Sequence, residues 1–197
     1  MMNEWIMMEG GALSSRPDDE FLEAPGAAPL RRLRASDGPA VLEAFRSDAE
    51  MSRQGTVRTI EEARTYVTRL LEDPQAQQAW AVTDDDDRLI GLIGLSIDQA
   101  NLTGWFWYWM HAEHRGQGLT GSAAAAIAAW ALDPAGGGLE RLELGHRANN
   151  PASAAVARAA GFIQEGLERG KFLIGGQRID VLTYGRLRSD PPPAPRT

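Results

Sequence analysis

A glycine-bearing segment that runs directly into an alanine-rich stretch is the part of this sequence best suited to bind an anion. Its residues are Arg115, Gly116, Gln117, Gly118, Leu119, Thr120 and Gly121. Glycine lets backbone N–H groups approach a ligand without a Cβ in the way, and a helix N-terminus carries partial positive charge. Because the alanines from Ser122 to Leu132 favour a helix, the segment predicts an anion cradle that could hold a pyrophosphate.

Two interpretations of this segment stay open from the glycines alone, an ordinary glycine-rich turn and a phosphate cradle. The segment lacks the Gly-Lys-Ser/Thr ending of a P-loop, and a dinucleotide-binding fold is disfavoured as well.

A second helix start carries polar side chains that could do chemistry. Asn150 is followed by Pro151, which is the pattern of a helix cap with proline at the first helical position. The helix should run to about Ala160 and end at Gly161. Ser153 then falls in the first turn, either as an ordinary first-turn serine or as a functional hydroxyl.

Hydrophobic periodicity, caps and turn residues predict the order βααβββαβαββ. The first half comprises a strand at 30–34, a helix from 36 or 37 to 47, a helix begun by the capping box Thr59–Glu62, and a hairpin of 80–82 with 89–97 across the acidic turn 84–87. The second half comprises a strand at 105–110, the helix at 122–132, a strand at 142–144, the helix at 151–160, and strands at 167–174 and 178–187 joined by Gly175-Gly176.

Composition bounds the possible partners and the organisation of the chain. The 197 residues carry a formal charge of -7, which argues against a nucleic-acid partner, and no apolar run is long enough to span a membrane. The absence of cysteine excludes disulfides and thiol catalysis and fits a reducing cytoplasm. We expect a flexible leader without a signal peptide at 1–28, one folded domain at 29–188, and a disordered proline-rich tail at 189–197. We expect no metal, since the turn 84–87 lacks the spaced ligands of a calcium loop.

Three segments together resemble the GNAT superfamily of acyl-CoA N-acyltransferases, and most of all its RimJ/RimL type of ribosomal-protein N-acetyltransferase. They are EHRGQGLTG, NNPASAAVARAAGF with Asn150, Ser153, Gly161 and Phe162, and FLIGGQRIDVLTYGRL. The resemblance covers about 29–188. It implies an α/β (α+β) fold with a mixed, mainly antiparallel sheet of about seven strands, flanked by about four helices.

The resemblance also implies roles for particular residues. Backbone amides from Arg115 to Gly121 would hold the pyrophosphate of acetyl-CoA, and the strand end at Trp109, Met110 and His111 would pair with the pantetheine. Asn150 would hydrogen-bond the pantetheine, and Ser153 would donate a proton to the departing thiolate.

The acidic general base that RimL-type enzymes carry on the middle strand falls at Trp105 in this sequence. The histidines available as replacements are His111 and His146. Glu113 also stands where many relatives have Gln or Arg, although the phosphate cradle survives this change because its donors are backbone amides.

Five aromatic residues in a row occupy the strand that ends at Met110. Because side chains alternate along a strand, Trp105, Trp107 and Trp109 should share one face, and Phe106 and Tyr108 the other. One set must pack the core. The other either lines an acceptor groove, where Trp105, Trp107 and His146 would bind substrate, or is buried under helices as well.

The resemblance implies transfer of an acetyl group to a primary amine by direct attack in a ternary complex. An α-amine is neutral in roughly a tenth of molecules at pH 7, and a lysine side chain in only about four of ten thousand. A protein or peptide N-terminus is therefore the first-choice acceptor. A small antibiotic or metabolite amine, or a non-catalytic CoA-binding module, stays open as an alternative. The acyl chain, the general base, the start codon and the choice between monomer and homodimer stay open too.

Overall fold

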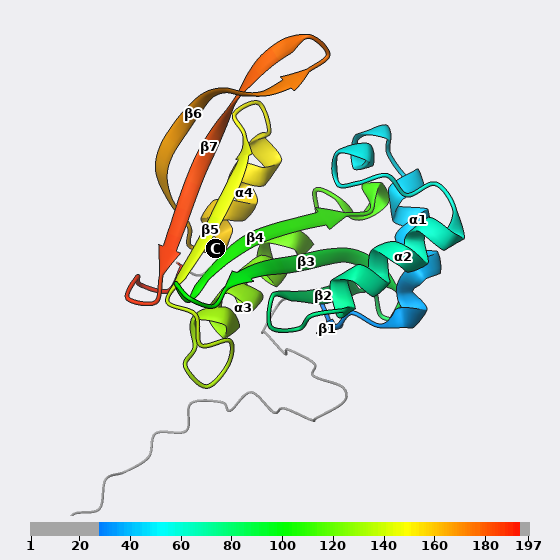
Figure 1. Cartoon of the computed structure of the whole chain (residues 1–197), viewed down its shortest axis with the longest axis horizontal. Coiled ribbons are helices and arrows are strands. Elements are labelled where there is room, and N and C mark those ends of the chain that lie inside the picture. Colours follow the sequence, from blue (N-terminus) through cyan, green and yellow to red (C-terminus); the bar gives the residue numbers. More distant parts are fainter. Residues whose placement is uncertain (1–27, 194–197) are drawn as a thin grey trace, which may run out of the picture.

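Seven strands form a single sheet in the computed structural model, which describes residues 28–193 (Figure 1). The strands are β1 Leu30–Arg32, β2 Gln77–Thr83, β3 Leu89–Asp98, β4 Thr103–Met110, β5 Arg141–Arg147, β6 Ile163–Ile174 and β7 Gln177–Leu187. Their order in the sheet is β1-β2-β3-β4-β5-β7-β6, and every neighbouring pair is antiparallel except β4 with β5. This confirms the predicted mixed, mainly antiparallel sheet.

Four α-helices cover the two faces of the sheet. They are α1 Gly38–Arg46, α2 Ile60–Leu71, α3 Leu119–Leu132 and α4 Pro151–Ala159. The first two pack on one face and the last two on the opposite face. The order of strands and α-helices along the chain is the predicted one. Three short 3-10 turns were not predicted: η1 Ala35–Asp37, η2 Ala49–Arg53 and η3 Ala112–His114.

Local side-chain bonds explain where two of the helices begin. The hydroxyl of Thr59 accepts from the N–H of Glu62 at 3.2 Å, and the Glu62 carboxylate accepts from the N–H of Thr59 at 3.1 Å, as the capping box predicted. The Asn150 side-chain oxygen accepts from the N–H of Ser153 at 3.1 Å, as predicted for a cap. Helix α3 begins at Leu119, three residues before the predicted start, because Gly118 reverses the chain with a φ of +78°.

Two hydrophobic cores, one on each face, divide the aromatic residues of β4. Phe106 is buried in the core under α3 and α4, and Trp109 in the core under α1 and α2, so the two sets face opposite ways as predicted. Trp107 packs against the second core, while Trp105 is 42% exposed. Both faces of β4 are thus covered near Met110, and one face opens to solvent at Trp105.

Strands β4 and β5 run side by side only at their first residues. Thr103, Gly104 and Trp105 pair with Arg141–Glu143, after which the two strands diverge (Figure 1). Strand β5 continues to pair with β7 as far as Arg147. The second half of β4 therefore has a paired neighbour, β3, on one side and a gap on the other.

The predicted leader 1–28 lies outside the described residues except for Ala28, which is buried in the core under α3 and α4. The predicted tail is described only as far as Pro193. Among the described residues, the helices are too short or too polar to cross a membrane.

The ring of Trp107 lies directly over Gly94 of β3, where a Cβ would come 2.1 Å from the Trp107 Cζ2 atom. Substitution Gly94→Ala should therefore lower the free energy of unfolding by about 1–3 kcal/mol, through overpacking, in a urea titration. Gly38→Ala is the control, because a Cβ there would come no closer than 3.3 Å to any atom, the nearest being Arg64 Cγ, with the Arg64 backbone at 3.8 Å. Equal stability of the two variants would contradict the packing described.

Candidate active site

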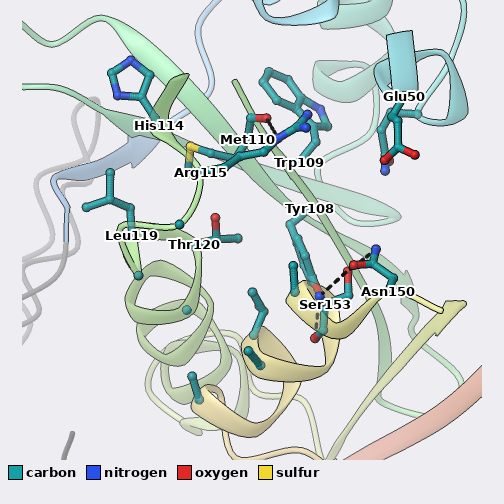
Figure 2. A pocket seen from close by; sticks show the side chains of 18 of the residues that line it. Glu50, Tyr108, Trp109, Met110, His114, Arg115, Leu119, Thr120, Asn150 and Ser153 are labelled. Atoms are coloured by element: carbon teal, nitrogen blue, oxygen red, sulfur yellow. Dashed lines mark hydrogen bonds between the residues drawn. The ribbon is translucent and has the colours of Figure 1, made fainter. Parts of the chain in front are cut away.

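A cavity of about 550 Å³ lies where the end of β4, the N-terminus of α3 and the N-terminus of α4 meet (Figure 2). It brings together most of the residues singled out from the sequence. Those in its lining are Trp109, Met110, Arg115, Gly116, Gly118, Leu119, Thr120, Gly121, Asn150 and Ser153. Helix η2 supplies a further wall with Glu50, Met51 and Arg53, continued by Gln54.

The N-terminus of α3 presents backbone N–H groups to this cavity. The first amide of the helix to bond within it is that of Ser122, which donates to the carbonyl of Gly118 at 3.1 Å. The amides of Leu119, Thr120 and Gly121 precede this bond and are the donors that a helix leaves for a cap or ligand. Three arginines also line the cavity, of which Arg53 pairs with Glu50 and Arg115 with Asp48. The backbone donors and the charge of Arg147 are suited to a phosphate group.

The spacing of Gly116, Gly118 and Gly121 does match the G-x-G-x-x-G pattern, so the sequence pattern alone does not separate this segment from a dinucleotide site. The fold does separate them. Dinucleotide-binding folds have mostly parallel sheets, whereas this segment follows a strand of a mainly antiparallel one.

The second half of β4 offers backbone groups to the gap beside β5. The N–H of His111 donates to the carbonyl of Ile90 at 2.9 Å, so these residues form a hydrogen-bonded pair between β3 and β4. Such pairs alternate along an antiparallel ladder. The N–H and C=O groups of Tyr108 and Met110 therefore face away from β3, toward the gap. An extended ligand could bind them as an added strand does.

Asn150 and Ser153 are joined by two hydrogen bonds at the start of α4 (Figure 2). The Asn150 Nδ2 atom donates to the Ser153 Oγ atom at 3.0 Å. Because the serine oxygen is the acceptor in this bond, its own proton remains available for a third group. The Ser153 hydroxyl is thus held in a fixed position in the wall of the cavity.

Tyr108 lines the same wall, and its hydroxyl donates to the backbone carbonyl of Ser153 at 3.3 Å. Burial raises the pKa of Tyr108 to about 12, so the phenol is protonated at neutral pH. The ring therefore fixes the end of β4 against α4 without adding charge.

The predicted residue His111 lies outside the cavity lining. Its Nδ1 atom accepts a hydrogen bond from the N–H of Glu113 at 3.3 Å and caps η3. Burial is the largest influence on this ring and lowers the pKa of His111, against the opposing effect of Glu113. The imidazole is therefore neutral at pH 7, with the nitrogen that caps η3 already engaged.

The predicted substrate residues Trp105, Trp107 and His146 do not line the cavity either, and the side chain of Gln117 is turned back to the carbonyl of Glu113. His146 is buried and stacked on Tyr184 with ring centroids 5.1 Å apart. Trp105 lies over Gly145 on the open part of the sheet. The assignment of these three residues to an acceptor site remains a prediction.

The sequence did not reveal the wall built by η2, and neither Tyr108 nor Arg147 was predicted as a particular site residue. Glu50 is the one carboxylate in the described lining, and it pairs with Arg53 at 2.6 Å. The sequence feature that marks η2 is Asp48, whose side chain accepts from the N–H of Glu50 at 2.9 Å and caps the turn. Aspartate is a strong capping residue, but five residues without periodicity do not predict a helix.

Residues 29–163 match the family model described as the acetyltransferase (GNAT) domain, and the chain belongs to this family. This confirms the resemblance seen in the sequence. The chain is 33% identical over 103 residues to the ribosomal-protein-serine acetyltransferase of Escherichia coli K12. That match covers 52% of this chain and 56% of the relative, so the chain spans about half the length of the curated relative that it matches.

Solved structures show the same fold. A CoA complex of RimL, the ribosomal L7/L12 alpha-N-protein acetyltransferase, superposes with a TM-score of 0.76 at 23% identity, covering 85% of this chain and 98% of the other. A chimera of the Vibrio cholerae spermidine N-acetyltransferase gives 0.70 at 23% identity, covering 81% and 95%. At these identities the likeness extends to the fold and not to the acceptor.

Substitution Gly116→Val tests the anion cradle, because Gly116 has a φ of +77° and lines the cavity. A valine strains the segment and shields its amides, so the Kd for CoA measured by calorimetry should rise at least about tenfold. Gly138→Val is the matched control. Its φ is +69°, and a Cβ at either glycine meets no atom within 4 Å, but Gly138 is not in the described lining. An equal loss of CoA affinity in both variants would mean that backbone strain alone, and not shielding of the amides, weakens binding.

Proposed function

We propose that this chain transfers the acetyl group of acetyl-CoA to the N-terminal α-amine of a protein or peptide. The observation that carries the proposal is the meeting, in one cavity, of the α3 N-terminus, the unpaired edge of β4 and the oriented hydroxyl of Ser153. Membership of the GNAT family supports the acetyl-CoA reaction. The name of the Escherichia coli relative, a ribosomal-protein-serine acetyltransferase, supports a ribosomal protein as the acceptor.

Acetyl-CoA, the carrier of the acetyl group, would be bound by backbone groups. The amides of Leu119, Thr120 and Gly121 would hold the pyrophosphate, and the edge of β4 at Tyr108 and Met110 would pair with the pantetheine. The carbonyl of Met110 already accepts from Arg115 at 3.0 Å, so Tyr108 and the N–H of Met110 are what remains for the ligand. An N–H at this point would stabilise the oxyanion that forms as the amine attacks.

The reaction follows as one exchange of bonds. The neutral amine nitrogen attacks the thioester carbonyl, the carbon–sulfur bond breaks, and the Ser153 hydroxyl gives its proton to the leaving thiolate. No dedicated base is needed to form the neutral amine, since an α-amine is already neutral in roughly a tenth of molecules at pH 7. After the attack, the nitrogen loses its extra proton to water. The serine then recovers a proton from solvent.

The acceptor side of the cavity carries one carboxylate, Glu50, in the described lining. Glu50 is paired with Arg53 at 2.6 Å, so we propose that the ammonium group of the acceptor replaces Arg53 as its partner before that group loses its proton. We further propose that the protein acts in the cytoplasm, where ribosomal proteins are made, without a nucleic-acid or membrane partner. Monomer and homodimer are both compatible with the proposal.

Substitution Ser153→Ala should lower kcat at least about a hundredfold and change the Kd for CoA by less than threefold, because the lost hydroxyl acts on the leaving group. Release of CoA thiol with a panel of peptides gives kcat, and calorimetry gives the Kd. Ser52→Ala is the control, since Ser52 is an exposed residue of η2 outside the described lining. An unchanged kcat in Ser153→Ala would remove the serine from the mechanism.

The pH dependence separates an N-terminal acceptor from a lysine. With a peptide whose N-terminus is free, kcat/KM should rise with pH and level off near the α-amine pKa of about 8. A peptide with a blocked N-terminus and one lysine should react far more slowly and still gain rate up to about pH 10. Preference for the lysine peptide, or for a small polyamine in the same panel, would overturn the proposed acceptor. Tight CoA binding without any turnover would identify a non-catalytic module.

A further inference from the structure

The guanidinium group of Arg115 bridges the end of β4 and the helix η2. Its Nε atom donates to the carbonyl of Met110 at 3.0 Å, and its Nη1 atom forms an ion pair with the carboxylate of Asp48 (Figure 2 shows the first bond). Residue 115 also begins the glycine segment that leads to α3. One side chain thus joins the carrier side of the cavity to the wall on its other side.

Asp48 uses its two carboxylate oxygens for two different tasks. The Oδ1 atom accepts from the N–H of Glu50 at 2.9 Å and fixes the first turn of η2, while the Oδ2 atom meets Arg115. These bonds, that from Glu50 first, lower the pKa of Asp48, so the carboxylate is charged at neutral pH. The position of the turn that carries Glu50 and Met51 therefore depends on Arg115.

The preceding residue makes a second tie between the same two parts. The hydroxyl of Ser47 donates to the carbonyl of Ala44 at 2.7 Å and accepts from the N–H of Ala112 at 3.0 Å. Ala44 belongs to α1, and Ala112 follows the end of β4. The chain entering η2 is thus bound to the chain leaving β4 at two adjacent points.

The exposure of this ion pair argues for a role in placement rather than in folding. The side chain of Arg115 is 39% exposed and that of Asp48 29% exposed. Ion pairs at such exposure add little to the stability of a fold, because water and salt screen them. A pair at the rim of a cavity still fixes where two walls stand relative to each other.

We propose that Asp48 is a positioning residue for the amine acceptor, acting through Arg115 to hold the η2 wall against the carrier-binding segment. The inference rests on the proposed function in that the η2 wall is taken as the acceptor side. It has two consequences. Carrier bound at the glycine segment steadies η2, so carrier and acceptor bind cooperatively, and the charge of Arg115 serves this bridge instead of the pyrophosphate.

Substitution Asp48→Asn keeps an oxygen for the N–H of Glu50 and removes the charge that meets Arg115. It should raise the acceptor KM at least fivefold and leave kcat and the Kd for CoA within twofold. The matched control is Asp98→Asn at the end of β3, where Asp98 likewise accepts from backbone N–H groups, those of Ala100 and Asn101. That control should leave all three constants unchanged.

A readout without any acceptor completes the test. In the unaltered protein, CoA should slow hydrogen exchange of the amides of residues 49–54, and in Asp48→Asn this protection should be lost although CoA binds. If no peptide is acetylated, the proposed function fails and the exchange result alone decides the coupling. Equal protection in both proteins would overturn the inference. The inference would also be overturned if Arg115→Gln raised the Kd for CoA tenfold and left the acceptor KM unchanged, because the guanidinium would then serve the pyrophosphate.

Discussion

The parting of β4 from β5 is the constraint on which the site depends. Once the strands diverge after Trp105, the backbone groups of Tyr108 and Met110 have no strand beside them. Backbone N–H and C=O groups need partners, and an extended ligand with amide groups can supply them much as a missing strand would. In the proposed binding mode, the gap therefore sets both the shape of the ligand and its direction, which runs along β4 toward the N-terminus of α3.

The other parts of the cavity are arranged around that gap. The N-terminus of α3 lies at one end of it, with amides for the charged part of a carrier. On the opposite side, α4 begins at the Asn150 cap, which places Ser153 in the wall and occupies the serine oxygen as an acceptor. Arg115 then closes the end of β4 by binding Met110 and tying it to η2. The groups that we propose for carrier binding, proton donation and placement of the acceptor thus all lie around the same short stretch of β4.

Much of the fold was predictable because it is specified locally. The capping box at Thr59, the cap at Asn150 and the period of α2 each depend on residues close in sequence, and the structure confirms them. The bridge from Arg115 to Asp48 joins residues 67 positions apart, so no local sequence pattern predicts it. The divergence of β4 and β5 depends on how the two strands meet in the assembled sheet, which is not a local property either. The aromatic run shows both cases, since alternation predicted the two faces, but only the assembled sheet shows that Trp105 is half exposed over Gly145.

Backbone amide chemical shifts of the isotope-labelled protein, followed by NMR during a titration with CoA, test the central claim most directly. The account predicts that the largest shifts occur at residues 116–121, together with Tyr108 and Met110, because those amides form the new hydrogen bonds. Saturation by CoA with the amides of Leu119, Thr120 and Gly121 unshifted would contradict it, since the carrier would then be bound elsewhere on the molecule.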